Sequence, residues 1–202
     1  MPFYQYVLGP AGGTPATDLT YARQRALDLR LDEPSTATFV IDGRSEQAAT
    51  IAELATELSV YRDRELIFRG PIGATSDTIT EDRHDITVTA VDYRGRLDRL
   101  TIDADVTYTS QLDRDIAWDL IVNAQAKTGG NLGITRGPAL TGATSRTITF
   151  TGGITVRQAL DRLASLSPGF DWDVTPDRQF RLWDQRGADN GVILDYGGLV
   201  AN

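Results

Sequence analysis

Residues 26–43 read ALDLRLDEPSTATFVIDG, and this stretch decides the fold of the first half of the chain. Apolar side chains take alternate positions in both of its runs: Leu27, Leu29 and Leu31, then Ala37, Phe39 and Ile41. A period of two is typical of strands with one buried face. The Asp-Glu-Pro-Ser sequence at residues 32–35 favours a turn between the runs. We therefore expect an antiparallel hairpin.

Further strands follow with the same alternation. Leu58 and Val60 lead to Asp63 and Arg64, the expected turn, after which residues 66, 68, 70 and 72 alternate again. Residues 84–92 form a strand rich in β-branched side chains. Residues 46–58 hold either a short helix or only a loop. These patterns predict an antiparallel β-barrel or sandwich over residues 1–105.

From Ser110 the apolar period changes to one typical of a helix. Its stripe comprises Leu112, Ile116, Leu120 and Ala124, with Ala117 and Ile121 alongside. Ser110 and Asp113 have the spacing of a capping box, and Gly129 and Gly130 supply a stop signal. We expect an amphipathic helix between these signals.

A second helix and a hairpin are expected after it. Thr155 is the expected cap of a helix that ends before Pro168, and its apolar stripe comprises Val156, Ala159, Leu160 and Leu163. Residues 171–175 and 179–184 then flank the turn sequence Pro-Asp-Arg. The predicted class is α+β, mainly β: the barrel or sandwich, a smaller α+β domain over residues 106–190, and the start of a further segment at 191–202.

Composition excludes several classes of function. The 202-residue chain has 28 acidic and 20 basic residues, a net charge of −8 and no cysteine. Scattered charges argue against a surface that grips nucleic acid phosphates, and without cysteine there is no disulfide, thiolate metal site or cysteine nucleophile. No apolar run is long enough to span a membrane, and no signal-peptide pattern is present. These features are typical of a globular protein folded in the cytoplasm.

Two clusters invite a binding-site interpretation, and both have a simpler one. Residues 9–13, Gly-Pro-Ala-Gly-Gly, lack the lysine and the following helix of a phosphate-binding loop, which favours an ordinary loop. The four carboxylates around the hairpin of residues 171–184 offer oxygen ligands for calcium: Asp171, Asp173, Asp177 and Asp184. Because the glycine and glutamate of an EF-hand loop are missing, we expect an amphipathic hairpin, and whether it binds an ion is left open.

Catalytic and sugar-binding candidates are equally weak. Asp113 and Asp115 can be read as a glycosidase pair, but a chain with 28 acidic residues has many chance pairs. His84, the single histidine, has no Gly-x-Ser-x-Gly elbow to serve and is expected at a solvated strand edge. Trp118 is expected to pack in a core or interface, whereas the roles of Trp172 and Trp183 stay open between packing and sugar stacking. We expect no catalytic, cofactor-binding or metal-binding residue.

Several segments together resemble a known family. They are residues 26–43, residues 60–63 (Val-Tyr-Arg-Asp) with 68–70 (Phe-Arg-Gly), residues 91–94 (Val-Asp-Tyr-Arg) with 97–99 (Leu-Asp-Arg), residues 116–121 (Ile-Ala-Trp-Asp-Leu-Ile), residues 128–137 (Thr-Gly-Gly-Asn-Leu-Gly-Ile-Thr-Arg-Gly) and residues 169–172 (Gly-Phe-Asp-Trp). In this order they resemble the minor tail proteins, or tail-hub proteins, of long-tailed phages that infect actinobacteria. The similarity is collinear over about residues 20–185 and includes no catalytic motif.

The resemblance implies a structural virion protein assembled in the host cytoplasm and located at the distal end of a non-contractile tail. Such hubs are trimers whose β-barrels form a pseudo-sixfold ring that continues the tail tube. The implied partners are the distal tail protein, the tape measure protein and receptor-binding or fibre proteins. DNA passes through the lumen without specific binding, which suits a negatively charged chain. No enzyme activity and no cofactor are implied.

Two alternatives belong to other classes, and one feature departs from the family. A tail-associated cell-wall hydrolase would use acidic residues such as Asp171 and Asp173, and a carbohydrate-binding adhesion module would use Trp172 and Trp183. Hubs of this family continue well beyond 202 residues through a second barrel. We therefore expect the sequence to correspond to the front portion of a hub.

Overall fold

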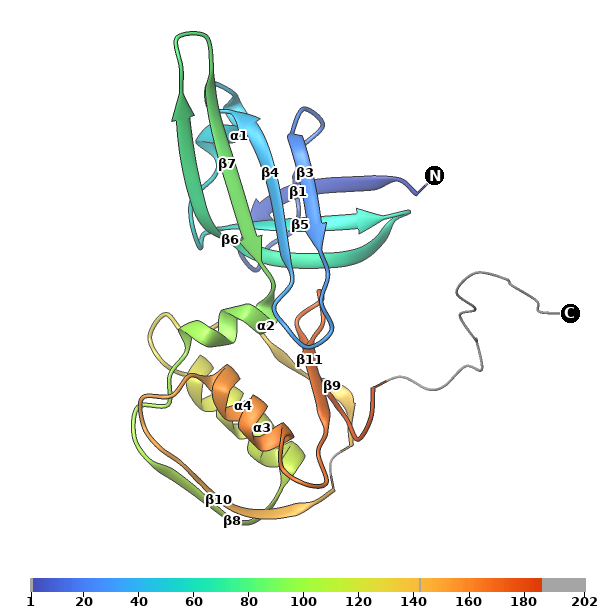
Figure 1. The fold of residues 1–202 in the computed structure, drawn as a ribbon, viewed down its shortest axis with the longest axis vertical. Coiled ribbons are helices and arrows are strands. Elements are labelled where there is room, and N and C mark those ends of the chain that lie inside the picture. Colours follow the sequence, from blue (N-terminus) through green and yellow to red (C-terminus); the bar gives the residue numbers. More distant parts are fainter. Residues whose placement is uncertain (1, 142, 187–202) are drawn as a thin grey trace, which may run out of the picture.

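The structure is a computed structural model that describes residues 2–141 and 143–186. Two bodies are stacked along the long axis, an antiparallel sheet above and helices with small sheets below (Figure 1). The predicted class, mainly β with a smaller α+β part after an antiparallel β part, is confirmed. Within the described ranges, no helix is both long and apolar enough to cross a membrane.

The upper body is a curled seven-stranded sheet with the order β2-β1-β5-β6-β7-β4-β3, and its neighbouring strands are antiparallel. The strands are β1 (Tyr4–Pro10), β2 (Thr17–Asp18), β3 (Arg23–Asp28), β4 (Thr36–Asp42), β5 (Thr56–Arg62), β6 (Glu65–Ile79) and β7 (His84–Val91). Its inward side chains form one apolar core that includes Phe39, Leu58, Val60 and Phe68. The sheet therefore closes part of the way around its own core.

The curl comes from β6, which pairs with two neighbours in turn. It pairs with β5 as far as Pro71 and with β7 from Ile72 onward, so the two parts of the sheet run in different directions (Figure 1). A Cβ added at Gly70 would lie 2.0 Å from the carbonyl oxygen of Val91. Glycine is thus required where β6 leaves one part of the sheet for the other.

The hairpins form as the sequence predicts, except at one point. Asp63 and Arg64, with φ of 51° and 74°, form the turn between β5 and β6 as predicted. The β3–β4 hairpin also forms, but β3 ends at Asp28, and Leu29 and Leu31 are 51% and 66% exposed. The prediction of one buried leucine face was wrong there, because β3 is an edge strand and its later residues continue as a loop beyond the core.

Residues 46–58, for which helix and loop were both open, begin with the short helix α1 (Glu46–Ala49). Ser45 caps it, because its side chain accepts a hydrogen bond from the amide of Ala48. The chain then turns into β5, which begins at Thr56.

The lower body packs two helices against two small sheets. Its elements are α2 (Tyr93–Arg96), the 3-10 turn η1 (Leu97–Arg99), β8 (Val106–Leu112), α3 (Asp113–Gln125), β9 (Thr135–Leu140), β10 (Ser145–Phe150), α4 (Val156–Ala164), β11 (Asp171–Val174) and β12 (Gln179–Trp183). β10 pairs with β8, and β12 lies between β11 and a parallel β9. Both predicted helices and the predicted hairpin form, whereas β8, β9 and β10 were not foreseen.

One helix start was predicted correctly and the other was not. At α4, Thr155 and Gln158 form a reciprocal capping box. At α3 the N-cap is Leu112 and makes no side-chain cap bond, so the Ser110–Asp113 capping box was wrong. The reason is that Ser110 lies within β8, which runs directly into the helix.

The boundary between the two apolar cores lies just before Tyr93 in the chain. The first core reaches Ala90, and the second begins at Tyr93 and includes Leu97 and Leu100. Residues 93–100 thus pack with the lower body, although the sequence pattern placed the end of the first domain near residue 105. We retain two domains as a proposal, with the helix α2 at their junction. The segment expected at residues 191–202 lies outside the described residues.

Candidate functional site

The acidic hairpin of β11 and β12 is an amphipathic hairpin. Trp172 and Val174 are buried, while the alternating aspartates face outward. Asp173 pairs with the Arg186 guanidinium at 3.1 Å, and Asp171 accepts a hydrogen bond from the Arg186 amide at 2.5 Å. Among the residues that the structure describes, no group of three or more metal-binding side chains converges. The two best placed carboxylates therefore already have a partner within the chain.

The two aspartates considered as a glycosidase pair belong to two separate ion pairs. Asp113 is buried at the start of α3 and pairs with Arg146 on β10 at 2.9 Å, whereas Asp115 pairs with Arg136 on β9 at 2.8 Å. A glycosidase needs two carboxylates that face one substrate bond. The arginines instead hold these two carboxylates against different strands.

His84 lies at the start of β7, half-buried, with its Nε2 3.3 Å from Asp77 Oδ1. It lines an open cavity of about 450 Å³ at the outer end of the upper body. Ser45 lines the same cavity, but its hydroxyl donates to the Asp42 carbonyl and caps α1. The serine is thus held by its own helix turn, and no serine–histidine hydrogen bond is among the contacts of these two described residues.

The tryptophans serve mainly in packing. Trp172 is 3% exposed, and Trp118 stacks on Phe180 with 6.3 Å between the ring centroids. Trp183 is half-exposed and lies under the Arg186 guanidinium at 5.3 Å. The interpretation of Trp118 as a packing residue is consistent with these contacts. A sugar platform that needs the face of Trp172 has no support, because this ring is inside the fold.

The glycine-rich loop of residues 9–13 binds a carboxylate of the chain itself. The Gly12 amide donates to Glu57 Oε2 at 3.0 Å, and the Tyr93 hydroxyl donates to the same oxygen at 2.5 Å. Arg69 forms an ion pair with Glu57, whose side chain is 2% exposed. Burial, followed by the hydrogen bond to Glu57, raises the pKa of Tyr93 well above its usual value. The loop therefore closes a buried polar cluster between the two bodies.

A second polar cluster joins the bodies around Arg94, which is 4% exposed. Its Nη1 donates to the Leu31 carbonyl at 2.8 Å and to the Trp172 carbonyl at 3.1 Å. Its guanidinium lies 4.2 Å from the centroid of the Trp172 ring. Asp161 accepts from the Trp172 indole at 3.1 Å and lies 3.7 Å from Arg94 Nη2. Arg94 thus links the β3–β4 loop to the lower body.

Asp92 completes the junction as the cap of α2. Its carboxylate accepts the Gly95 amide at 2.8 Å and the Ser35 amide at 2.7 Å. Burial raises the pKa of this carboxyl against the opposing effect of these two amides. We call these two sets of residues the junction clusters. One set comprises Asp92, Arg94, Asp161 and Trp172, and the other comprises Glu57, Arg69 and Tyr93.

The junction clusters are not predicted by the sequence patterns. One signal was present, since Glu57 and Arg69 interrupt strands whose neighbours Leu58 and Phe68 are strongly apolar. Charged residues in such positions are seldom buried unless they are paired. The partner of each one is fixed only by the pairing of β5 with β6 and by the position of α2.

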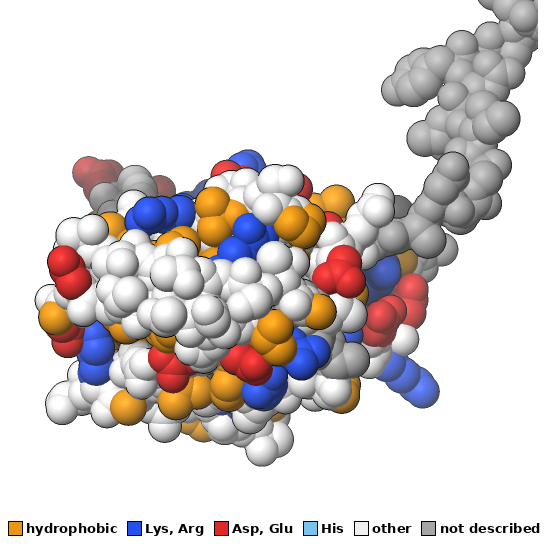
Figure 2. Space-filling model, turned by 90° about the horizontal axis from the view of Figure 1, so that it is seen from below, with side chains coloured by type: hydrophobic (Ala, Val, Ile, Leu, Met, Phe, Trp, Pro, Cys, Tyr) orange, Lys and Arg blue, Asp and Glu red, His pale blue; other side chains and the backbone are white. Residues whose placement is uncertain are grey.

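The end of the lower body carries surface charges of both signs. Figure 2 shows acidic and basic side chains interspersed over the end of the lower body, with hydrophobic side chains between them. This face has no one-signed patch of the kind that binds nucleic acid.

The fold is shared with known proteins, although no family model and no curated protein sequence matches the chain. A tail protein of Neisseria meningitidis MC58 is similar over 90% of this chain and 51% of its own length, at a TM-score of 0.65 and 16% identity. The 43 kDa tail protein of prophage MuSo2 from Shewanella oneidensis is similar over 90% of this chain and 53% of its own length. Its TM-score is 0.60 and its sequence identity 14%. At this identity the likeness establishes the fold.

A third similar structure comes from a secretion system. It is an Escherichia coli component of the type VI secretion system, described as structurally similar to the bacteriophage T4 tail proteins gp27 and gp5. The similarity covers 89% of this chain and 49% of that protein, at a TM-score of 0.52 and 12% identity. The chain spans about half the length of all three structures.

Proposed function

We propose that this chain is a structural subunit of a bacteriophage tail. The observation that carries the proposal is the likeness to the Neisseria meningitidis tail protein over 90% of the chain, which includes both bodies. A match that covered the upper sheet alone would concern a common type of β-structure. This match extends over the junction as well, so it concerns the particular way in which the two bodies are joined.

The finer role that we propose is that of a hub at the distal end of the tail. The collinear sequence resemblance to tail-hub proteins supports it, and so does the likeness to a protein that resembles the T4 tail proteins gp27 and gp5. In this role the chain is a trimer that continues the tail tube and contacts the distal tail protein, the tape measure protein and receptor-binding or fibre proteins. DNA passes through the lumen, and the net charge of −8 disfavours its adhesion to the wall.

The junction clusters support a mechanical task. Buried arginines and carboxylates at the junction hold the two bodies in one relative orientation, because displacing either body would leave buried charges without partners. A rigid subunit keeps a tube wall in shape while other tail parts move. The proposed action is thus assembly and load-bearing rather than turnover of a substrate.

Immunogold electron microscopy tests the proposal. Antibodies raised against the purified chain are applied to particles of the phage that encodes it, and label at the tail end away from the capsid is expected. Label along the whole tail would contradict the distal position, and particles without label would contradict the virion role. A zymogram against host cell walls tests the enzymatic alternative. A cleared band that is lost in Asp171→Asn and Asp173→Asn variants would overturn a purely structural role.

A further inference from the structure

The turn end of the β6–β7 hairpin is the outermost part of the upper body (Figure 1). We call residues 74–83 the arm. From Ala74 to Arg83 every side chain is exposed, and Ile79 is 73% exposed. Strand β7 pairs with β4 as far as Asp85, whereas β6 from Ala74 onward pairs with β7 alone among the described strands, so no further strand covers its outer edge. The arm therefore presents exposed side chains and an outer strand edge that a partner can contact.

The tip of the arm is acidic as well as apolar. Asp77, Glu81 and Asp82 are close to Ile79 in the chain, and Arg83 is the single basic residue of the arm. Within the described part of the chain, Glu81 and Asp82 take part in no ion pair. The arm thus carries a net charge of about −2 next to a large exposed aliphatic side chain.

A groove of matching character lies on the side of the same body. Its volume is about 430 Å³, and it is lined by Tyr4, Tyr6, Arg25, Leu27, Leu29, Arg62 and Ile67. Tyr4 is 40% and Leu29 51% exposed. The lining contains two arginines and no carboxylate, although the chain as a whole has a charge of −8.

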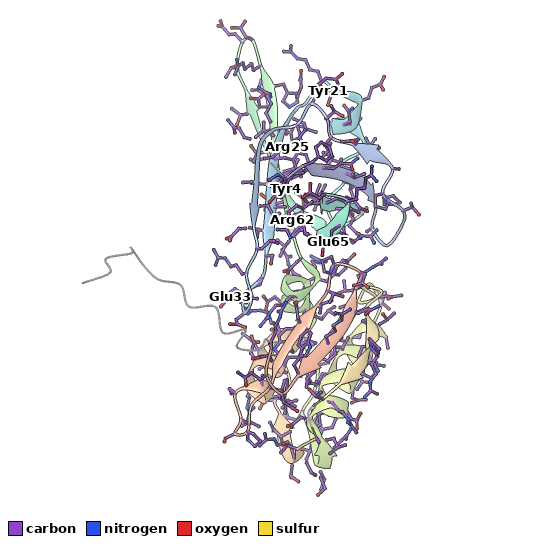
Figure 3. All side chains as sticks on the ribbon, turned by 90° about the vertical axis from the view of Figure 1, so that its right-hand side faces the viewer. Tyr4, Tyr21, Arg25, Glu33, Arg62 and Glu65 are labelled. Atoms are coloured by element: carbon purple, nitrogen blue, oxygen red, sulfur yellow. The ribbon has the colours of Figure 1, made fainter. Side chains whose placement is uncertain are left out.

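Neither arginine of the groove is neutralised by a carboxylate of the described residues. Arg25 donates to backbone carbonyls, among them Thr20 at 2.8 Å and Ala22 at 3.0 Å, and Arg62 forms no ion pair. Figure 3 shows Arg25, Tyr4 and Arg62 one after another along one side of the upper body, with Glu65 next to them outside the lining. The groove therefore offers apolar surface and positive charge together.

We infer that the arm of one copy of this chain docks in the groove of a second copy, with Ile79 against Tyr4 and Leu29 and the acidic tip against Arg25 and Arg62. The inference rests on the proposed function, to which it adds the contact between subunits. The arm and the groove are different surfaces, so the contact is head-to-tail. A head-to-tail contact closes into a ring when its rotation is a whole fraction of a turn. The charge and apolar complementarity of arm and groove selects a second copy as the occupant.

Cysteine cross-linking tests the contact, because the chain has no cysteine of its own. Ile79→Cys and Leu29→Cys variants, one of them carrying a size tag, are mixed and oxidised mildly. A disulfide forms only when the two Cα atoms come within about 7 Å of each other. We expect a covalent dimer of the two variants at several times the yield of either variant alone. The matched control replaces Leu29→Cys by Val122→Cys, at a 40% exposed position on α3.

The outcomes separate the inference from the proposed function. Equal yields from the 79–29 and 79–122 mixtures, preferential 79–79 dimers, or no cross-link would each overturn the docking of the arm. None of these results affects the immunogold label at the tail end, which tests the virion role separately.

Charge reversal provides an independent measurement by sedimentation velocity. Arg62→Glu is expected to weaken self-association at least about tenfold, and adding Asp82→Arg to the same chain is expected to restore part of it. Circular dichroism confirms that both variants remain folded. If Arg62→Glu associates as the parent chain does, or if the chain is monomeric at all concentrations, the inference is wrong.

Discussion

The guanidinium of Arg94 lies 4.2 Å from the centroid of the Trp172 ring, and its Nη1 donates to the Trp172 carbonyl at 3.1 Å. Arg94 belongs to α2 at the beginning of the lower body, and Trp172 to β11 near its end. The same Nη1 donates to Leu31 in the β3–β4 loop of the upper body. One buried side chain thus connects the loop of one body with the last hairpin of the other.

Replacing Arg94 by alanine is expected to destabilise the protein by about 2 to 3 kcal/mol. The substitution removes the stacking on Trp172 and leaves the Leu31 and Trp172 carbonyls without this donor. All three tryptophans lie in the lower body, so their fluorescence reports on that body while far-ultraviolet circular dichroism reports on both. We expect the two urea unfolding curves to coincide for the parent chain and to separate for Arg94→Ala.

Arg44→Ala is the control for this experiment, because Arg44 is exposed and lines the cavity at the outer end of the upper body, away from the junction. Its effect on the free energy of unfolding is expected to stay within about 0.5 kcal/mol. Coincident curves for Arg94→Ala at unchanged stability would show that Arg94 does not couple the bodies.

The helix caps give a matched pair of substitutions. Thr155→Ala removes the side chain that accepts the Gln158 amide and is expected to cost about 1 kcal/mol. Ser110→Ala is expected to be neutral within about 0.5 kcal/mol, because Ser110 lies in β8 and its side chain caps no helix. Thermal unfolding of both variants measures the difference. A loss of stability in Ser110→Ala as large as that in Thr155→Ala would favour the capping box that the sequence suggested.

The buried carboxylate of Glu57 is expected to be the costliest polar group to alter. Glu57→Gln removes the charge that faces Arg69 and replaces one carboxylate oxygen by an NH2 group, which cannot accept from Arg69 on one side or from Tyr93 and Gly12 on the other, at an expected cost of about 3 kcal/mol. Tyr93→Phe removes a single donor and is expected to cost about 1 kcal/mol. Chemical denaturation ranks the two variants. The reverse order would mean that the hydroxyl, rather than the ion pair, holds this cluster together.

The Asp92 carboxyl gives a prediction about pH. Because burial raises its pKa in the folded state, the folded chain holds this proton more tightly than the unfolded chain does. The contribution of Asp92 to stability is therefore greatest below the unfolded pKa of about 3.9 and falls as the pH rises through the folded pKa. Asp92→Asn lacks this titration, so its stability relative to the parent is expected to increase with pH across that window and to level off above it.

Urea unfolding at pH 4 to 7 measures this difference. Asparagine has one oxygen acceptor in place of two, so either the Ser35 or the Gly95 amide loses its partner. This loss lowers the stability of Asp92→Asn by an amount that does not depend on pH. Asp28→Asn, which makes the same chemical change at an exposed position, is the control. A relative stability of Asp92→Asn that decreases with pH would contradict the raised pKa.

The sequence determined the features that depend on neighbouring residues. Alternating side chains located the β3–β4 and β5–β6 hairpins, a helical period located α3 and α4, and Thr155 marked the start of α4. These signals are local, because a strand or helix exposes one face at a period set by its own backbone. The class, mainly β with a smaller α+β part, followed from them.

Tertiary structure decided which elements meet and what each charged residue does there. Strands β8, β9 and β10 were missed because β9 pairs in parallel with β12, which follows it by some forty residues, and β8 pairs with β10 across the helix α3. Asp113 looked like a cap residue or a catalytic acid and is instead the buried partner of Arg146. Arg94 carries no local sign of its role at the junction, and the apolar neighbour of Glu57 signals that this carboxylate is buried without identifying its partner. Pairings of this kind depend on distances between remote segments, and no period in the sequence encodes them.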